Sequence, residues 1–398
     1  MILHVACLPF PSYQGTQAAL DAMLRASMES SRSAHLLVYS HGAYALSAPY
    51  PIHRIPDFPK VRSLRSGPSL GKLALDARCI AETRRLVRHI RPKAIVAHHI
   101  EAALAAIAAQ VGPLYYVAHT SLSHELPVYL PLLPRRMVSR AAGRTEAFVC
   151  ERAHGVAAVA PALAALLGDH VRYLPVPWRA PTSTDRPSPS EARRALGLPP
   201  EDLVCLYAGN LDRYQGWEHL LEALAVLRTT HATASLLVAT ESDPRHARRQ
   251  AHHLRIGGAV RFRPLDGEKA RALAHAASDL AWIPRRIEGG LPIKMLDAFA
   301  RGLPVIAMER ARAGLSTGGA CMIVGNDDPG DLAAAARRLL DDGRTRDSLR
   351  ERAFRYLSTH HGTAAFDAAM QALLGVAPTP GSMPSGRHRR ASLEPRAR

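Results

Sequence analysis

Short apolar segments alternate with amphipathic segments along most of this chain, and this alternation constrains its fold more than any other feature. Over the first 176 residues it predicts strands at 2–8, 35–39, 94–97 and 114–118, and helices at 16–30, 73–89 and 102–110. Strands separated by helices form parallel sheets, because the helix carries the chain back to the end where the next strand starts. The first half of the chain is therefore predicted to be an α/β layer structure.

A second series of the same kind follows residue 190. Its strands are predicted at 203–207, 234–239, 260–262, 280–283 and 304–307, and its helices at 190–197, 217–228, 245–254, 268–277 and 293–301. Helical segments then continue from residue 328 to about 374. The second half is thus predicted to be another sheet covered by helices on both faces.

We expect the domain boundary in the segment 175–189, which is rich in Pro, Ser and Thr and suits neither helix nor strand. With 398 residues, 47% of them apolar, the chain is long enough to bury two cores. The prediction is an N-terminal domain at 1–178 and a C-terminal domain at 179–375, whose last helices can pack back on the first. Residues 376–398 lack apolar periodicity, which predicts a disordered basic tail.

The composition argues against a zinc-binding, a secreted and a membrane-spanning protein, but it does not identify the binding partner. The five cysteines form no CxxC pair and no zinc-ligand spacing with histidines, which fits a reducing compartment. Residues 1–10 do not resemble a signal peptide, and the apolar tract 102–118 is broken by Gly112 and Pro113, so no membrane span is predicted. We expect a cytoplasmic protein, either free or peripheral at the inner face of the membrane. The net charge of +17 suits nucleic acid, an anionic membrane or phosphorylated small molecules.

The segment 280–305 carries the strongest functional signal. A predicted strand ends in arginines, two glycines form a loop without side chains, and a helix opens with a lysine and an aspartate. Free N–H groups at a helix start attract anions, and α/β folds bind ligands at the carboxyl ends of their strands. The alternative is an ordinary strand-turn-helix with a surface ion pair. The candidate donor-binding residues here are Arg285, Gly289, Gly290, Leu291, Pro292, Lys294 and Asp297.

This segment resembles the donor-binding motif of family-4 GT-B glycosyltransferases, also described as glycosyl transferases group 1. That motif has the form Glu, seven residues, Glu, then Ala-Met-Ala-x-Gly-x-Pro-Val; here Asp297 stands at the second glutamate and residues 298–305 match the part from Ala to Val. Gly289 stands at the first glutamate, and Glu288 lies one residue too early. In this respect the chain resembles a subset of the family with Gly-Leu-Pro-x-Lys at this place. Asp297 lies about one turn deeper in the helix than the anion site, where its carboxylate is placed to accept hydrogen bonds from ribose hydroxyls of a donor.

A second segment, 206–216, resembles the family's Gly-Arg-Leu-x-x-x-Lys-Gly loop, whose arginine and lysine neutralise the donor diphosphate. Asn210 and Gln215 occupy those two positions, so both charges are missing. We expect Arg213, Arg285, Arg286 or Lys294 to supply charge instead. A plain strand-to-helix turn is the alternative. The candidate donor-binding residues in this segment are Gly209, Asn210, Arg213 and Gln215.

In the N-terminal half, Gly15 and Thr16 follow the first strand and resemble the family's acceptor-side loop, with Thr16 as a possible helix cap. His119 ends the strand 114–118, where the family places a histidine that faces the donor sugar. His98 also ends a strand, and Glu125 lies in the loop expected after His119. The candidate catalytic residues are therefore His119, Glu125 and His98, with a buried hydrogen-bonding role as the alternative for the histidines.

The resemblance implies a GT-B fold, two Rossmann-like α/β/α domains facing across a cleft, and transfer of a hexose-type sugar from a nucleotide-diphosphate sugar with retention of configuration. No Asp-x-Asp motif follows a strand, so we expect neither a metal nor a cofactor beyond the donor itself. Arginines interleaved with apolar residues between 130 and 144 form a basic amphipathic stretch suited to an anionic membrane, which suggests a lipid or lipid-linked acceptor.

Two other classes stay open at this point. A GT-B-fold nucleotide-sugar epimerase would bind the same donor but needs a pair of catalytic carboxylates, for which Glu101 and Glu125 are the candidates. A nucleic-acid-binding protein without enzymatic activity would use the basic surface, yet aromatic residues are sparse and no binding motif is present, so no nucleic-acid partner is expected.

Overall fold

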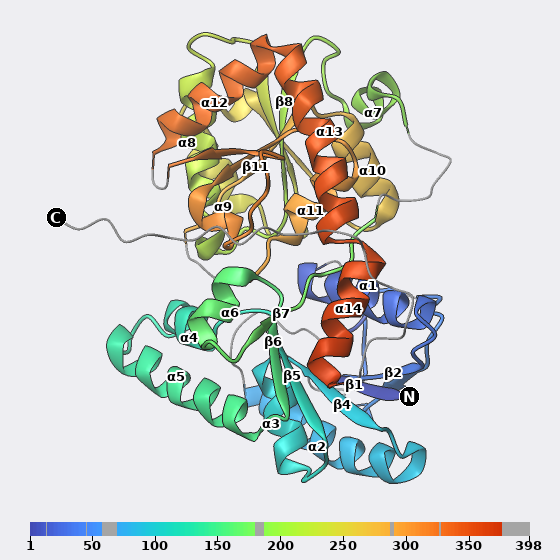
Figure 1. Cartoon of the computed structure of the whole chain (residues 1–398). Helices are drawn as coiled ribbons and strands as arrows, with labels where there is room; N and C mark the ends of the chain where they lie inside the picture. Colours follow the sequence, from blue (N-terminus) through green and yellow to red (C-terminus); the bar gives the residue numbers. More distant parts are fainter. Residues whose placement is uncertain are drawn as a thin grey trace, which may run out of the picture.

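The structure is a computed structural model that describes residues 1–12, 14–44, 46–57, 70–179, 187–286, 290–325 and 328–375. The predictions for the tail at 376–398, for Gly289 and for much of the linker lie outside these residues. Two α/β domains lie one above the other, each built on a parallel sheet (Figure 1). The predicted α/β architecture of two domains is confirmed.

The first sheet has seven parallel strands in the order β3-β2-β1-β4-β5-β6-β7. Their bounds are Ile2–Ala6 (β1), Ala34–Val38 (β2), Ile52–Arg54 (β3), Ala94–His98 (β4), Leu114–Ala118 (β5), Gly155–Ala158 (β6) and Arg172–Tyr173 (β7). The helices around it are Gly15–Glu29 (α1), Leu70–Ile90 (α2), His99–Ala108 (α3), Leu122–Tyr129 (α4), Arg135–Arg152 (α5) and Pro161–Leu167 (α6). The strand order reverses between β1 and β4, which makes the carboxyl edge there the usual ligand site of such a sheet.

The second sheet repeats this topology with six parallel strands in the order β10-β9-β8-β11-β12-β13. The strands are Leu203–Ala208 (β8), Ala234–Ala239 (β9), Val260–Arg263 (β10), Leu280–Ile283 (β11), Val305–Met308 (β12) and Met322–Val324 (β13). The α-helices are Pro189–Leu196 (α7), Trp217–Leu227 (α8), Arg245–His253 (α9), Glu268–Ala276 (α10), Ile293–Ala300 (α11), Pro329–Asp341 (α12), Gly343–His360 (α13) and Thr363–Leu374 (α14), and 3-10 turns lie at Arg213–Gln215 (η1), Gly257–Ala259 (η2) and Glu309–Arg312 (η3). Here the order reverses between β8 and β11.

The last helix, α14, lies on the N-terminal domain, beside α1 and the strands β6 and β7 (Figure 1). The turn between α13 and α14 is hydrogen-bonded to the segment that leaves the N-terminal domain. Trp178 N–H donates to the His361 carbonyl over 2.8 Å, and His361 Nδ1 lies 2.7 Å from the Val176 carbonyl. Arg32 also pairs with Asp367 of α14. The chain therefore crosses between the domains twice, and the two crossings are tied together.

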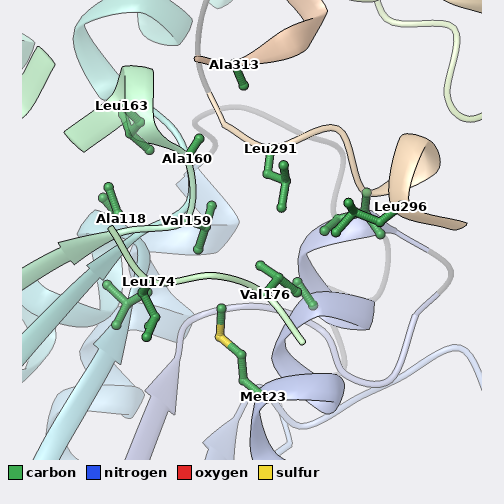
Figure 2. Close-up of a cluster of buried hydrophobic side chains, with 14 of the residues drawn as sticks. Met23, Ala118, Val159, Ala160, Leu163, Leu174, Val176, Leu291, Leu296 and Ala313 are labelled. Atoms are coloured by element: carbon green, nitrogen blue, oxygen red, sulfur yellow. The ribbon is translucent and has the colours of Figure 1, made fainter. Parts of the chain in front are cut away.

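Buried apolar side chains of the two domains pack against each other. Figure 2 shows Leu291, Leu296 and Ala313 of the C-terminal domain facing a group of buried side chains that includes Met23 and Val159 of the N-terminal domain. Beside this group, Ala162 N–H donates to the Ala313 carbonyl over 3.1 Å. Buried apolar area of this kind stabilises the arrangement in which the carboxyl edges of both sheets come together.

Several short elements were not predicted. The strand β3, Ile52–Arg54, lies in a stretch for which neither a strand nor a helix was predicted, and β6, β7 and β13 have two to four residues each. Segments this short carry too few residues to show a period of two, and their pairing with a neighbouring strand decides their conformation. Of the described helices, none combines the length and the apolar character that crossing a bilayer requires.

Candidate functional site

The carboxyl edges of the two sheets meet where Gly290 faces His119. A Cβ atom added to Gly290 would lie 1.8 Å from the His119 carbonyl oxygen, so only glycine allows this approach. Gly290 follows β11, and His119 follows β5. We use the name interdomain site for this contact and the charged groups around it, Arg285, Lys294 and Glu125.

Lys294 lies in the first turn of α11 and points toward the loop after β8. Its Nζ donates to Gln215 Oε1 over 2.7 Å and to the Tyr207 hydroxyl over 3.2 Å, and it lies 4.4 Å from the centre of the Tyr207 ring. Burial lowers the pKa of Lys294 to about 7; the charge of Arg285 adds to this effect and that of Asp212 opposes it. A partly buried ammonium whose hydrogen-bond partners are neutral groups is suited to an incoming anion.

Gly209 makes room for this lysine. Its φ of 157° is rare for other residues, and a Cβ atom there would lie 2.9 Å from Lys294 Nζ. The glycine predicted as part of a donor loop therefore serves the close approach of a cation to the end of β8.

Arg285, which follows β11, is the second cation of the interdomain site and is buried, with only 7% of the residue exposed. One of its terminal nitrogens donates to the Gly290 carbonyl, and its Nε has no hydrogen-bond partner among the described residues. Burial lowers the pKa of Arg285, while the nearby Tyr214, Glu125 and Tyr207 act in the opposite direction. The guanidinium carbon lies 6.0 Å from the centre of the Tyr214 ring.

The other two candidate cations lie outside this cluster. Arg213 is exposed on η1, and Arg286 is exposed and pairs with Glu218 at 3.7 Å. Asn210 uses its carbonyl to accept a hydrogen bond from the Tyr207 hydroxyl, and its side-chain Oδ1 is buried without a partner in the described part of the chain. Of the four cations proposed to replace the missing charges, Lys294 and Arg285 are the two that the fold brings together.

Asp297 faces away from these groups. Its Oδ1 accepts from Arg301 Nε over 3.1 Å, and its Oδ2 lies 3.8 Å from both Arg271 and His275. Burial alone would raise the pKa of Asp297, but the charges of His275, Arg301 and Arg271 hold it below its usual value. Among the described residues, the partners of this carboxylate are two arginines and a histidine, so the alternative of a surface ion pair between Asp297 and Lys294 is wrong. The predicted contact of Asp297 with the donor stays a prediction.

Four histidines, His4, His98, His99 and His119, lie together in the N-terminal domain, next to the interdomain site. His119 is buried; its Nε2 lies 2.9 Å from His98 Nδ1, and His98 Nε2 lies 2.9 Å from His4 Nδ1. His99 stacks on His119 with ring centres 4.8 Å apart. Burial lowers the pKa of His119, His98 and His4 far below the ordinary value, so these three rings are neutral. The two predicted catalytic histidines thus touch, with His98 beneath His119.

Glu125 lies in the first turn of α4 and not in a loop, and His124 precedes it there, which corrects the prediction. The helix forms because its first N–H, on Leu122, donates to the Glu146 carboxylate of α5 over 2.6 Å, a tertiary cap invisible in the local sequence. Burial raises the pKa of Glu125, opposed by Arg285 and by a hydrogen bond from Thr120.

Gly15 begins α1 and faces Ile293 of α11, whose Cβ would be 3.4 Å from an added Cβ atom. Thr16 does not cap this helix, because α1 starts one residue earlier than expected and the capping position falls on Gln14, which makes no side-chain cap bond. Gly15 therefore belongs to the contact between α1 and α11.

Four residues of this region were not identified from the sequence: Tyr207, Asp212, Tyr214 and His4. Tyr207 and His4 lie within apolar strands, where the pattern indicates core residues. They gain polar partners because β1 pairs with β4, which ends in His98, and β8 pairs with β11, which precedes Arg285 and Lys294. No group of three or more side chains able to bind a metal ion lies together in the described ranges.

Comparisons with known proteins show similarity in sequence over part of the chain and in fold over most of it. The sequence model of the family described as Glycosyl transferases group 1 matches residues 202–342. The chain is 33% identical over 166 residues to D-inositol 3-phosphate glycosyltransferase 2 of Catenulispora acidiphila, a match covering 38% of each protein. The chain spans less than half the length of the curated relatives it matches.

Solved structures show the same fold over nearly the whole chain. Sucrose-phosphate synthase from Thermosynechococcus elongatus superposes with a TM-score of 0.75 at 16% identity, covering 94% of this chain and 98% of that one. Anabaena HepE in complex with UDP-glucose gives 0.72 at 17% identity, covering 94% and 99%. Residues 202–342 are therefore similar to the glycosyl transferases group 1, and the chain as a whole has the two-domain GT-B fold of these solved structures.

Proposed function

We propose that this protein is a glycosyltransferase that takes a hexose-type sugar from a nucleotide-diphosphate sugar. The observation that supports this most is the pair of cations, the buried Arg285 and the partly buried Lys294, beside the N-terminus of α11 at the strand reversal of the second sheet. Two such charges with neutral hydrogen-bond partners are costly unless an anion joins them. A diphosphate carries charge of the required sign and amount.

In this proposal the diphosphate is neutralised by protein groups and not by a divalent cation. Lys294 and Arg285 supply the charge that the family's arginine and lysine supply elsewhere, and the free N–H groups of α11 add to it. Such preorganised donors stabilise the charge that develops on a leaving diphosphate. HepE, which has the same fold, has been solved with UDP-glucose, so a uridine nucleotide is the first donor to test.

We propose that transfer occurs with retention and that His119 orients the sugar. The carboxyl edges of both sheets meet at His119 and Gly290, so the reacting sugar would be enclosed between the domains. Exclusion of water protects an activated donor from hydrolysis. An epimerase would instead need a carboxylate pair acting on the same sugar, and formation of an epimerised nucleotide sugar without acceptor would favour that class.

For the acceptor we propose a lipid or lipid-linked molecule at an anionic membrane surface. Leu132, Leu133 and Met137 are 96%, 54% and 66% exposed, beside the exposed Arg135 and Arg136 at the start of α5. Exposed apolar side chains next to arginines suit insertion at the boundary of anionic lipids. The curated relative is named for a small phosphorylated acceptor, inositol 3-phosphate, which is the alternative acceptor to test.

The donor proposal is tested by thermal shift with UDP, GDP, ADP and their sugar conjugates, with and without chelator. A ligand that binds the native state raises its apparent stability. We expect one nucleotide to give a shift that the chelator does not remove. The absence of a shift with every nucleotide would remove the proposed donor site.

The acceptor proposal is tested by sedimentation with vesicles of phosphatidylglycerol or phosphatidylcholine. We expect binding to the anionic vesicles, weakened in Met137→Ser. Leu73→Ser is the matched control, since Leu73 is exposed to 65% on α2 without belonging to this surface. Equal binding of both variants would shift the proposal toward a soluble acceptor.

A further inference from the structure

The histidines beneath His119 form a continuous hydrogen-bonded chain across three neighbouring strands. His4 lies on β1, His98 ends β4 and His119 follows β5, and the nitrogens that face each other are 2.9 Å apart at both links. Each link joins a Nδ1 atom to a Nε2 atom, and the chain ends at His4 Nε2 on one side and His119 Nδ1 on the other. Both hydrogen bonds of this histidine chain can therefore point in the same direction, from His4 to His119 or the reverse.

A neutral imidazole carries one N–H and one nitrogen lone pair, so the protonated nitrogen of one histidine determines which nitrogen of the next is protonated. Burial keeps the rings neutral, as described above. In the first arrangement, every ring is protonated on Nδ1: His4 donates to His98, His98 donates to His119, and His119 presents an N–H on Nδ1. In the second arrangement every ring is protonated on Nε2, each bond is reversed, and His119 presents a lone pair.

The buried end of the chain distinguishes these two arrangements. His4 Nε2 is buried and has no hydrogen-bond partner among the described residues. The first arrangement leaves only an unpaired lone pair there, whereas the second leaves an unpaired N–H. A buried N–H without an acceptor is rarer in proteins than an acceptor that lacks a donor. The first arrangement is thus the more stable one.

We infer that His98 and His4 are positioning residues that hold His119 in the form protonated on Nδ1, so that His119 offers a hydrogen-bond donor at the interdomain site. His99, stacked at 4.8 Å, and the close approach of Gly290 to the His119 carbonyl hold the ring and its backbone in place. What His119 donates to, a hydroxyl of the donor sugar, rests on the proposed function. The protonation pattern itself does not.

This inference restricts the role of His119. A nitrogen that carries a proton in the neutral ring cannot also accept one, so Nδ1 of His119 does not act as a general base. Its partner on the substrate must be an acceptor, such as a sugar hydroxyl oxygen. His98 acts only through His119, and His4 acts only through His98.

The test is a long-range proton-nitrogen correlation spectrum of the ligand-free protein labelled with nitrogen-15 in histidine. Comparison with His119→Gln assigns the His119 signals. We expect the pattern of a neutral ring protonated on Nδ1. In His98→Leu the bond to Nε2 is lost, and since the partner of one nitrogen sets the protonation of the other, a population protonated on Nε2 appears. His98→Asn, which can place an N–H near the lost Nδ1, restores the original pattern.

His35→Leu is the matched control. His35 Nδ1 lies 2.9 Å from His53 Nε2 on β2 and β3, with ring centres 5.2 Å apart as in the pair of His4 and His98, but outside the chain that ends at His119. The His35→Leu substitution should leave the His119 signals unchanged. A His119 ring protonated on Nε2 in the native protein, or the same pattern in His98→Leu as in the native protein, would overturn the inference.

A binding measurement separates this inference from the proposed function. UDP-glucose carries a sugar that UDP lacks, and UDP carries more negative charge on its terminal phosphate. Because this difference in charge is the same for the native protein and for a histidine variant, a change between them in the additional thermal shift given by UDP-glucose reports the sugar contact. We expect His98→Leu to lose this additional shift while keeping the shift with UDP. If no nucleotide binds but the protonation pattern is as expected, the proposed function fails and the histidine chain stands.

Discussion

Lys294 Nζ donates to Gln215 Oε1 over 2.7 Å, which places a cation from α11 beside the amide that stands at the lysine position of the family's donor loop. The charge missing from one segment is thus provided by another that lies 79 residues further along the chain. With Arg285 on the neighbouring strand end, the interdomain site keeps two positive charges although both family positions are neutral.

Replacement of Lys294 by alanine should weaken binding of UDP-glucose. A hydrogen bond to a charged group contributes about 1.5–3 kcal/mol, so the dissociation constant should rise by roughly 10- to 100-fold. Isothermal titration calorimetry measures it. Lys269→Ala, an exposed lysine on α10, is the control and should bind as the native protein does. Unchanged affinity in Lys294→Ala would exclude this lysine from the donor site.

Affinity for UDP-glucose should fall as the pH rises above 7. Burial lowers the pKa of Lys294 to about 7, and a bound diphosphate favours the charged amine, so binding is strongest below the pKa of the free protein and weakens above it. UDP-glucose is suitable because its diphosphate bears no terminal group that titrates in this range. Titrations from pH 6 to pH 9 should show this slope in the native protein and lose it in Lys294→Met.

The same lowered pKa has a consequence for the free protein. Between about pH 7 and the ordinary pKa of lysine, the unfolded chain holds a proton on Lys294 that the folded protein lacks, so the free energy of unfolding should rise with pH across this window. Urea unfolding of the native protein and of Lys294→Met at several pH values isolates this contribution. An identical pH dependence in both proteins would mean that Lys294 has an ordinary pKa.

Gly290→Ala should prevent the two domains from closing. The added Cβ atom would lie 1.8 Å from the His119 carbonyl oxygen, so the domains must separate to accommodate it. We expect a larger radius of gyration in small-angle X-ray scattering and an affinity for UDP-glucose weaker by about tenfold or more. Gly258→Ala is the control, because nothing lies within 4 Å of an added Cβ atom there.

Asp297→Asn should destabilise the protein more than it weakens nucleotide binding. The Asp297 carboxylate is buried among Arg301, Arg271 and His275, and removal of one partner of a buried ion pair costs about 3–5 kcal/mol. The midpoint of urea unfolding measures this loss. Asp243→Asn, in an exposed pair with Arg245, should change the midpoint little. A native midpoint with lost affinity would instead assign Asp297 to the donor.

The fold itself could be predicted to a large extent from the sequence. The strands β1, β4, β5, β8, β9, β11 and β12 lie where the apolar segments predicted them, because a strand buried in a parallel sheet must be apolar along most of its length. The motif around Lys294 was recognisable for a related reason. Glycines, a helix start and a lysine must lie at fixed spacing to approach one ligand, and this spacing is local in the chain.

Local sequence alone determined these elements, since strand and helix formation depend on the periodicity of neighbouring residues. The tertiary structure alone decided how charges and protons are arranged between them. It placed Lys294 against Gln215, surrounded Asp297 with cations from α10 and α11, and aligned His4, His98 and His119 from three strands far apart in the chain. Hydrogen bonds and ion pairs act over a few ångströms, so they depend on which segments the packed core brings into contact.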